Sequence, residues 1–436
     1  MKPIKVGLLG LGTVGAGTFN VLRRNQQEIM RRAGRAIEIS MIAVRNVERA
    51  RALVGTSCVV VGDAMLVVNN PDIDIVVELI GGTGLTKELV LTAIANGKHI
   101  VTANKALLAI HGNEIFKAAH DKGVMVAFEA AVAGGIPIIK SLREGLSANR
   151  IEWIAGIING TTNFILTEMR DKGLDFATVL KQAQDLGYAE SDPTFDIEGV
   201  DAAHKATIMA AIAFGIPMQF DKAHVEGISQ LQAIDITYAE QLGYRIKLLG
   251  ITKRTAKGIE LRVHPTLIPN TRLIANVEGA MNAVLVQGDA VGASMYYGRG
   301  AGAEPTASSV IADLVDVTRL ATADPEHRVP YLAFQPDAIN QEVILPMAEI
   351  TTSYYLRIRV ADQAGVLADV TRILADLSIS IDAMLQKEPA VNESQTDIII
   401  LTHQTQEKNV LAAMEKIEQL DAVFGAVTKI RMEQLS

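Results

Sequence analysis

The sequence predicts an α/β protein that has a doubly wound parallel sheet, a mixed α+β domain and a compact C-terminal βαββαβ unit. Three patterns predict this fold class: β-branched runs alternate with helical patterns over residues 1–140, two-residue alternation returns within 258–288, and the order βαββαβ follows Tyr354. At ~150 residues per domain, 436 residues suit two or three domains. A chain that is 49% hydrophobic and 21% charged can bury cores of that size.

The first 140 residues are expected to form the parallel sheet. Strand-like runs lie at 4–10, 37–44, 73–80, 99–103 and 124–130. Helix-like segments such as 87–96 and 113–121 separate several of them. Apolar runs spaced by helices are typical of a parallel sheet that is covered on both faces.

The pattern changes within residues 141–302, where we expect the mixed domain. One strand-like run at 151–158 precedes a polar loop at 159–163, and mostly helical segments continue to about 250. Alternation with a period of two then returns in 258–268 and 283–288. That period is typical of strands with one buried face.

The last part of the chain predicts one long helix, a linker and a third unit. An amphipathic helix is expected within 303–325, where it would complete the first domain. Residues 323–350 are expected to be a linker, because three prolines and no clear period occur within 323–342. Residues 351–436 then form the βαββαβ unit.

Charge and cysteine content exclude several classes of protein. The net charge of −8 argues against a partner that is a nucleic acid or an anionic membrane. Cys58 is the only cysteine, so the chain has no intrachain disulfide and no cysteine-built zinc site, and we expect Cys58 in the core. A reducing cytoplasm fits this content, and no uncharged stretch reaches the ~18 residues of a membrane span.

A dinucleotide site is predicted where the first strand ends. Gly10, Gly12 and Gly15 fit G-x-G-x-x-G between an apolar strand and a helical segment. The first two glycines allow a tight turn and close approach of a pyrophosphate, and the third permits close helix packing. At the start of a parallel α/β pattern, this motif indicates a Rossmann-type nucleotide domain.

The end of the second strand favours NADP over NAD. An acidic residue there would bind the ribose 2′-hydroxyl, but the strand ends in Val44, Arg45 and Asn46, and Glu48 is the first carboxylate after it. Arg45 would pair with a 2′-phosphate. The alternative interpretation is a solvated arginine at a strand end.

Polar residues also follow the fourth strand-like run. Lys105 comes where strand 99–103 turns into a helix, and ligands of open α/β sheets bind outside the carboxyl ends of strands. A lysine at a helix start opposes the macrodipole, which hints at another reason for its presence. A solvated side chain is the simpler alternative.

A second cluster lies in 187–214. Asp201 and Lys205 share a helix face, and Glu190 lies in the turn-rich approach. Such a pair is usually a surface ion pair of small energy. The helix from Ala206 to Phe214 is apolar nearly all round, however, so burial would make this pair a polar site and tune the lysine for proton transfer.

Residues 129–137 offer one carboxylate, that of Glu129, and a glycine-rich backbone with exposed carbonyls. Hard cations take oxygen ligands of this kind. A glycine-rich hinge between domains is the simpler account.

Taken together, these motifs resemble the homoserine dehydrogenase family over essentially the whole chain. The matching motifs are G-L-G-T-V-G at 10–15, T-A-N-K at 102–105, N-G-T-T-N at 159–163, G-Y-A-E-x-D-P at 187–193, D-I-E-G-V-D-A-A-H-K at 196–205 and G-R-G-A-G at 298–302. The family interconverts L-aspartate 4-semialdehyde and L-homoserine with NAD(P)H on the route to threonine and methionine. The resemblance is to its monofunctional members.

The resemblance implies roles for individual residues. Residues 141–302 would bind the substrate and dimerise. Glu190 and Asp201 would line the homoserine pocket, and either Lys205 or Lys105 would carry the proton. The cofactor would lie against Gly10, Thr13, Val14, Arg45, Lys105 and Gly302. A sodium ion would be held by Glu129, Val132, Gly134 and Ile136, three of them through backbone carbonyls.

The C-terminal βαββαβ unit resembles an ACT domain, a small module that senses amino acids. Asp362 and Gly365 lie in its first strand-to-helix loop, where such domains bind a ligand. The resemblance implies L-threonine as the inhibitor and a homodimer or homotetramer. A purely structural, dimerising role is the alternative.

Two other functions are compatible with parts of the sequence. Aspartate-semialdehyde dehydrogenase forms a thioester and needs a reactive cysteine, and Cys58 is a poor candidate within an apolar run. A non-catalytic sensor of NAD(P) and amino acids would not need Lys105, Glu190, Asp201 and Lys205 together.

Overall fold

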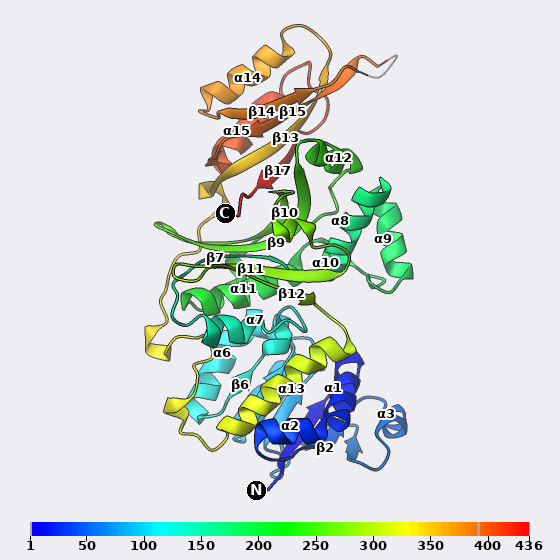
Figure 1. Cartoon of the computed structure of the whole chain (residues 1–436), viewed down its shortest axis with the longest axis vertical. Helices are drawn as coiled ribbons and strands as arrows, with labels where there is room; N and C mark the ends of the chain where they lie inside the picture. Colours follow the sequence, from blue (N-terminus) through cyan, green and yellow to red (C-terminus); the bar gives the residue numbers. More distant parts are fainter. Residues whose placement is uncertain (1, 390–392, 436) are drawn as a thin grey trace.

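The computed structural model describes residues 2–389 and 393–435 as three units stacked along the long axis of the molecule (Figure 1). The parallel sheet lies at one end, the mixed sheet in the middle and the C-terminal unit at the other end (Figure 1). The predicted fold class is confirmed. Within the described residues, no helix combines the length and apolar character that a membrane crossing requires.

The N-terminal sheet has the order β3-β2-β1-β4-β5-β6, and each neighbouring pair of strands is parallel. Its strands are β1 (Ile4–Leu9), β2 (Ile37–Ala43), β3 (Val59–Val61), β4 (Ile75–Glu78), β5 (His99–Thr102) and β6 (Val126–Ala127). Its helices are α1 (Thr13–Arg24), α2 (Gln26–Ala33), α3 (Val47–Val54), α4 (Met65–Val68), α5 (Leu85–Ala95) and α6 (Lys105–Lys122). From β1 the chain first adds strands on one side, β2 and β3, and then on the other side, β4 to β6. The switch point between β1 and β4 is where such sheets bind ligands.

Strand β3 was not predicted, because three residues are too few to show a period. Cys58, which precedes it, is only partly buried against the core, so the expectation of a core cysteine is only partly met. Burial raises the pKa of its thiol.

A helix from late in the chain completes the first unit. Helix α13 (Ala303–Leu320) packs along α1. A Cβ on Gly17 of α1 would lie 2.4 Å from the carbonyl oxygen of Ala303, so only glycine permits this contact. The helix ends five residues before the predicted limit of 325.

The middle unit is built on strands β7 (Ile151–Ile157), β9 (Tyr244–Thr255), β10 (Gly258–Pro269), β11 (Met281–Gly288) and β12 (Gly292–Arg299). Its helices are α7 (Ile138–Lys140), α8 (Gly160–Lys172), α9 (Phe176–Asp185), α10 (Thr194–Ile197), α11 (Val200–Phe214) and α12 (Ala233–Gln241), and β8 (His224–Val225) is a short strand beside β10. A π-helical turn (Ser141–Gly145) follows α7.

The prediction of mostly helical segments to about 250 was wrong for β9. Residues 246–252 of this strand are buried without alternation, because α11 packs near it and a second core cluster contains Leu249 and Ile251. A strand that is covered on both faces shows no period of two. The edge strand β12 was also missed, and its glycines weaken the pattern.

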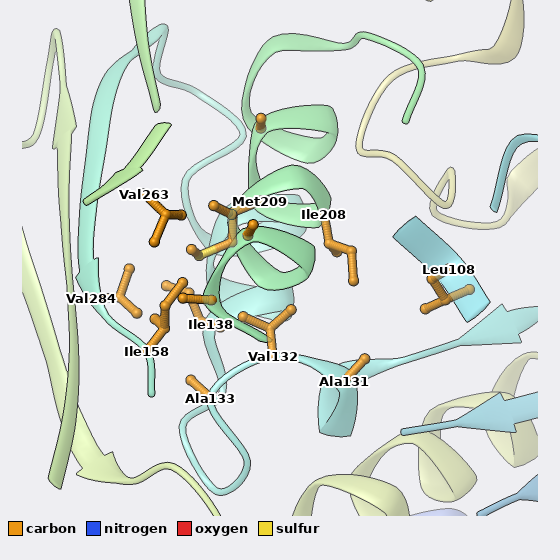
Figure 2. Packing of buried hydrophobic residues seen from close by; sticks show 14 of the residues in the cluster. Leu108, Ala131, Val132, Ala133, Ile138, Ile158, Ile208, Met209, Val263 and Val284 are labelled. Carbon is orange, nitrogen blue, oxygen red and sulfur yellow. The ribbon is translucent and has the colours of Figure 1, made fainter. Parts of the chain in front are cut away.

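Helix α11 forms the centre of the molecule. Every residue from Asp201 to Phe214 is buried. Figure 2 shows Ile208 pointing toward Leu108 of α6, while Met209 points toward Ile158 and Val263 at the mixed sheet. The polar first turn of this helix is therefore held between the two sheets.

The C-terminal unit has strands β13 (Thr351–Ala361), β14 (Ile381–Gln386), β15 (Gln395–Thr402), β16 (Thr405–Gln406) and β17 (Thr428–Met432), with helices α14 (Val366–Asp376) and α15 (Glu407–Glu418). Its main strand order is β17-β13-β15-β14. Strand β17 also pairs in parallel with β10, through Thr266 opposite Arg431 and Leu267 opposite Met432. The C-terminal unit thus extends the sheet of the middle unit.

Candidate active site

A chain of hydrogen bonds at the carboxyl ends of β4 and β5 places Lys105. The Oε1 atom of Glu78 accepts from the N–H groups of Ile80 at 2.8 Å and Gly81 at 3.0 Å. Its Oε2 atom accepts from the Thr102 hydroxyl at 2.7 Å. Glu78 is fully buried, so this carboxylate fixes two neighbouring loops from below.

Asn104 continues this arrangement and begins α6. Its backbone N–H donates to the Thr102 hydroxyl, and its side chain donates to the carbonyl of Gly82 at 2.7 Å. Its side-chain oxygen caps the helix by accepting from Leu107 N–H. Lys105 is therefore the first residue of a helix whose N-terminus is held by a side-chain cap. Glu78 was not predicted from the sequence, because a lone carboxylate at a strand end belongs to no motif.

The two lysines meet at one carboxylate. Lys205 Nζ lies 2.6 Å from Asp201 Oδ2, and Lys105 Nζ lies 3.1 Å from Asp201 Oδ1. Lys205 also donates to the carbonyl of Ile158 at 2.7 Å. Asp201 is 3% exposed and Lys205 8%, whereas one third of the Lys105 side chain is exposed. The interpretation of Asp201 and Lys205 as a surface ion pair is wrong, because α11 is buried in the core.

Asn159 completes the surroundings of this carboxylate. Its amide donates to Asp201 Oδ2 at 2.9 Å and to Asp196 Oδ1 at 2.8 Å. Its side-chain oxygen caps α8 through Thr162 N–H. Thr161 donates to Asp196 Oδ2 at 3.2 Å. Asn159 and Thr161 of the N-G-T-T-N motif therefore contact two aspartates through their side chains, a contact that the motif alone did not predict.

The electrostatics follow from two ammonium groups that share one buried carboxylate. Burial alone would raise the pKa of Asp201, but Lys205, Lys105 and Asn159 outweigh it and hold the pKa far below the ordinary value. Burial lowers the pKa of Lys205, and the second ammonium of Lys105 lowers it further. Burial and the charge of Asp201 raise the pKa of Asp196. A lysine in this state releases its proton more readily than a solvated one.

Two aromatic side chains and one histidine border the lysines. Lys105 Nζ lies 5.7 Å from the ring centroid of Phe195, within cation–π range. His204 packs between Phe195 and Phe220, at 5.4 and 4.3 Å between ring centroids. Burial lowers the pKa of His204 to about 4, so this imidazole is neutral near pH 7.

Glu190 stands apart from this cluster. It is exposed between α9 and α10, and its backbone carbonyl accepts a hydrogen bond from Gln184. Among the described residues, no hydrogen bond or ion pair joins its carboxylate to Asp201 or to either lysine.

The glycine motif leaves an open turn at the start of α1. Gly10 has φ of +93°, and a Cβ there would lie 2.8 Å from the carbonyl oxygen of Leu79. A Cβ on Gly15 would lie 2.3 Å from the carbonyl oxygen of Gly10. Gly12 begins the helix without a side-chain cap and has open space around it. Thr13 and Val14 follow in the first turn, so free N–H groups face this space.

Other residues expected at the cofactor surround the same edge. Arg45 is exposed two residues after β2 ends. Gly302, with φ of +125°, precedes α13. The turn at Gly12 and the exposed cation of Arg45 fit a phosphorylated nucleotide.

The segment after β6 uses the Glu129 carboxylate to begin a helix. Its two oxygens accept from the N–H groups of Ile139 and Lys140, each at 2.9 Å. Asp313 of α13 accepts from the N–H of Glu129 at 2.8 Å. Burial and the charge of Glu129 raise the pKa of Asp313 to about 7. This contact ties the segment to the first unit.

The carbonyls expected to bind sodium differ in their hydrogen bonding. The carbonyl of Gly134 accepts from the Ser309 hydroxyl at 2.7 Å, and that of Ile136 accepts from Ile138 N–H. In the part of the chain that the structure describes, no cluster of three His, Cys, Asp or Glu side chains is arranged to hold a metal. A site made of one carboxylate and three carbonyls is not of that kind.

The loop expected to bind a regulatory ligand is exposed. Asp362 lies in it, and Gly365, with φ of +100°, begins α14. The N–H of Asp362 donates to the carbonyl of Ser394.

Comparisons with known proteins agree with this geometry. Residues 10–129 match the profile described as homoserine dehydrogenase, NAD binding domain, residues 137–315 match homoserine dehydrogenase, and 354–422 match the ACT domain. The chain is 61% identical to a homoserine dehydrogenase of Pseudomonas aeruginosa and 60% identical to one of Neisseria gonorrhoeae, with all of each chain covered.

Solved structures give the same result. The fold matches the crystal structure of a homoserine dehydrogenase from Thiobacillus denitrificans with a TM-score of 0.96 and 69% identity, covering 100% of this chain and 99% of that one. A homoserine dehydrogenase of Staphylococcus aureus matches with a TM-score of 0.77 and 32% identity over 99% of both chains. The chain therefore belongs to the homoserine dehydrogenase family, with an NAD-binding domain, a catalytic domain and a C-terminal ACT domain.

Proposed function

We propose that this enzyme interconverts L-aspartate 4-semialdehyde and L-homoserine on the route to threonine and methionine, and that it uses NADP(H) in preference to NAD(H). The observation that carries the proposal is the pair of lysines on Asp201, together with the open turn at Gly12 at the start of α1. When bound, the nicotinamide supplies or accepts a hydride. The protein's own residues handle the proton and the developing charge.

Lys205 is proposed as the acid that protonates the substrate oxygen during reduction. Attack of hydride on an aldehyde builds negative charge on that oxygen, and a cation placed in advance stabilises this charge. The lowered pKa of Lys205 favours proton release, and Asp201 and the Ile158 carbonyl hold its ammonium in place. Lys105 adds a second positive charge, and the same lysine is proposed to border the cofactor. In the reverse direction, Lys205 is the base.

The amino-acid end of the substrate needs partners for an ammonium and a carboxylate. Glu190 and Asp201 are proposed to line this pocket. Asp201 is already paired with two lysines, so the exposed carboxylate of Glu190 is the better partner for the substrate ammonium. Binding would then require the segment around Glu190 to approach the lysines.

Arg45 is proposed to bind the 2′-phosphate of NADP. The support is its exposed position after β2, where an NAD-specific site places a carboxylate. A sodium ion is proposed at Glu129, Val132, Gly134 and Ile136, with Glu129 as the charged ligand. It would strengthen the junction between α7 and α13 and take no part in hydride transfer.

L-Threonine is proposed as an inhibitor that binds at Asp362 and Gly365 in the ACT domain. A homodimer or homotetramer is proposed, because such modules typically pair side by side. A cytoplasmic location is proposed, because a chain whose only cysteine is Cys58 forms no intrachain disulfide.

The test follows NADPH absorbance with purified protein and L-aspartate 4-semialdehyde, with and without millimolar L-threonine. Oxidation that depends on the semialdehyde and falls with threonine would support the reaction and the regulation. Turnover indifferent to threonine would retain the enzyme and remove the proposed regulation. Folded protein that turns over neither NADPH nor NADH would contradict the proposed reaction.

A further inference from the structure

Arg431 of the ACT domain binds two carboxylates, that of Glu407 in its own unit and that of Glu226 in the catalytic domain. Its side chain is 1% exposed. Its guanidinium donates to Glu407 at 2.9 and 2.6 Å and to Glu226 at 2.7 and 2.8 Å. Both contacts are bidentate, the strongest geometry for such a pair. Lys429 and Tyr354 also contact Glu407, so the position of the Glu407 carboxylate within the ACT domain is fixed.

Glu226 immediately follows β8, on the catalytic side of the junction. Its backbone N–H donates to the carbonyl of Val263 in β10 at 2.8 Å. His224 lies 2.9 Å from the same carboxylate. Burial alone would raise the pKa of Glu226, but the hydrogen bonds from His224 and Arg431 outweigh it and hold the pKa well below the ordinary value. The carboxylate is therefore charged throughout the physiological range.

The residues next to Glu226 press against the segment that carries the site. Ile228 N–H donates to the carbonyl of Ile197 at 2.8 Å. A Cβ on Gly227 would lie 2.3 Å from that oxygen, so the two backbones are in direct contact. Gly199, with φ of +81°, has the Glu226 carbonyl oxygen 3.3 Å from the position of a Cβ.

Both acidic residues of the site flank this contact. Asp196 immediately precedes Ile197 and is held by Asn159, while Asp201 lies two residues after Gly199 and binds both lysines. A shift of residues 226–228 would therefore move the backbone on which both carboxylates stand. Only Gly227 separates Glu226 from Ile228, the donor of the hydrogen bond to Ile197.

We propose that Arg431, acting through Glu226, is a positioning residue for the substrate pocket, so that the last strand of the ACT domain sets the placement of Asp196 and Asp201. The effect on turnover rests on the proposed reaction, whereas the effect on the backbone does not. A second ion pair at the same junction provides a matched control. Arg262 of β10 donates to Glu433 at 2.6 Å, and among the described residues Glu433 makes no hydrogen bond or ion pair with 226–228 or 194–201.

The experiment compares Glu226→Gln with Glu433→Gln in the full-length protein. Replacing Arg431 itself would remove a buried cation from two carboxylates at once and risks misfolding, whereas Glu226 is partly exposed and glutamine preserves its shape. Hydrogen exchange of the free protein is measured over residues 194–201. Steady-state KM values are measured for the semialdehyde and for NADPH.

We expect Glu226→Gln to accelerate exchange over 194–201 several-fold and to raise the KM for the semialdehyde by about five-fold, at the lower end of couplings between sites. The KM for NADPH should not change, and Glu433→Gln should resemble the wild type in every measurement. Unchanged exchange in Glu226→Gln, or the same change in Glu433→Gln, would overturn the proposal. Because exchange needs no substrate, this outcome is distinct from an absence of turnover in the wild type, which would count against the proposed reaction alone.

Discussion

Lys105 and Lys205, which lie on different domains, bind opposite oxygens of the same carboxylate, that of Asp201. One negative charge therefore serves two buried or half-buried ammonium groups. The excess positive charge has no other carboxylate partner in hydrogen-bond contact among the described residues. A substrate oxygen that becomes negative during hydride transfer would supply the missing charge.

Replacing Lys205 with alanine should abolish most turnover while preserving the fold. Asp201 would keep Lys105 and Asn159 as partners, so no carboxylate would be left without a partner. We expect kcat to fall by about 10²- to 10⁴-fold, the usual contribution of a general acid. Dissociation constants for NADPH, measured by fluorescence, should match the wild type. Unchanged turnover would exclude Lys205 as the acid.

Asp201→Asn should move the pH profile in a defined direction. Its negative charge raises the pKa of Lys205, so its removal lowers that pKa further. Reduction needs the protonated lysine, and the alkaline limb of the kcat profile should therefore shift to lower pH. Asp192→Asn is the control, because Asp192 is exposed and accepts a hydrogen bond from Thr194 N–H. This variant should leave the alkaline limb of the kcat profile unchanged. A shift to higher pH would contradict the proposed charge balance.

Arg45→Ala should raise the KM for NADPH without a matching rise in the KM for NADH. Loss of a charged hydrogen bond costs about 1.5–3 kcal/mol, so we expect the KM for NADPH to rise by about 10- to 100-fold and the KM for NADH to stay nearly constant. Arg49→Ala, which removes another exposed arginine nearby, should change neither constant. Equal effects of Arg45→Ala on both cofactors would show that no 2′-phosphate is read there.

Acid should destabilise the protein through His99. Its Nδ1 atom accepts a hydrogen bond from Met125 N–H at 3.0 Å, which requires the unprotonated ring. Burial, assisted by the charge of Arg328, lowers its pKa to about 4, against an ordinary value of 6.5. Between these values the unfolded chain binds more protons, so the free energy of unfolding rises with pH and falls as pH drops from 6.5 toward 4.

Urea unfolding at pH 7 and pH 5 measures this effect. The transition midpoint should fall at pH 5, and His99→Asn, which retains an acceptor without a titrating ring, should reduce the difference. His403→Asn, at an exposed site in the ACT domain, is the control. An identical pH dependence in His99→Asn and the wild type would assign the loss to other groups.

Gly17→Ala should weaken the packing of α13 against α1 in the first unit. The added Cβ would overlap the Ala303 carbonyl, which is backbone and cannot rotate away. Overpacking of this kind costs about 1–3 kcal/mol. Thermal unfolding should show a lower Tm for Gly17→Ala, whereas Gly145→Ala, at a site with open space, should be nearly neutral.

Much of the architecture could be predicted from local patterns. The parallel strands, the glycine turn and the βαββαβ order each occupy a short stretch of chain, in which period and turn residues carry the signal. Strand β9 was not predicted, because burial on both faces removes the alternation of apolar and polar residues. Glu190 shows the opposite case, since a motif suggested a site residue whose side chain stands apart from the cluster.

The sequence by itself determined the fold class, the family and the spacing that brings Asp201 and Lys205 onto one helix face, because these depend on interactions within a few residues. Only the tertiary structure decided that Lys105 and Asn159 reach the same carboxylate, that Glu78 supports the loop beneath Lys105, and that Arg431 reaches Glu226. Such contacts join residues far apart in the chain. They exist because the buried α11 and the shared sheet bring three units together, and no local pattern encodes that packing.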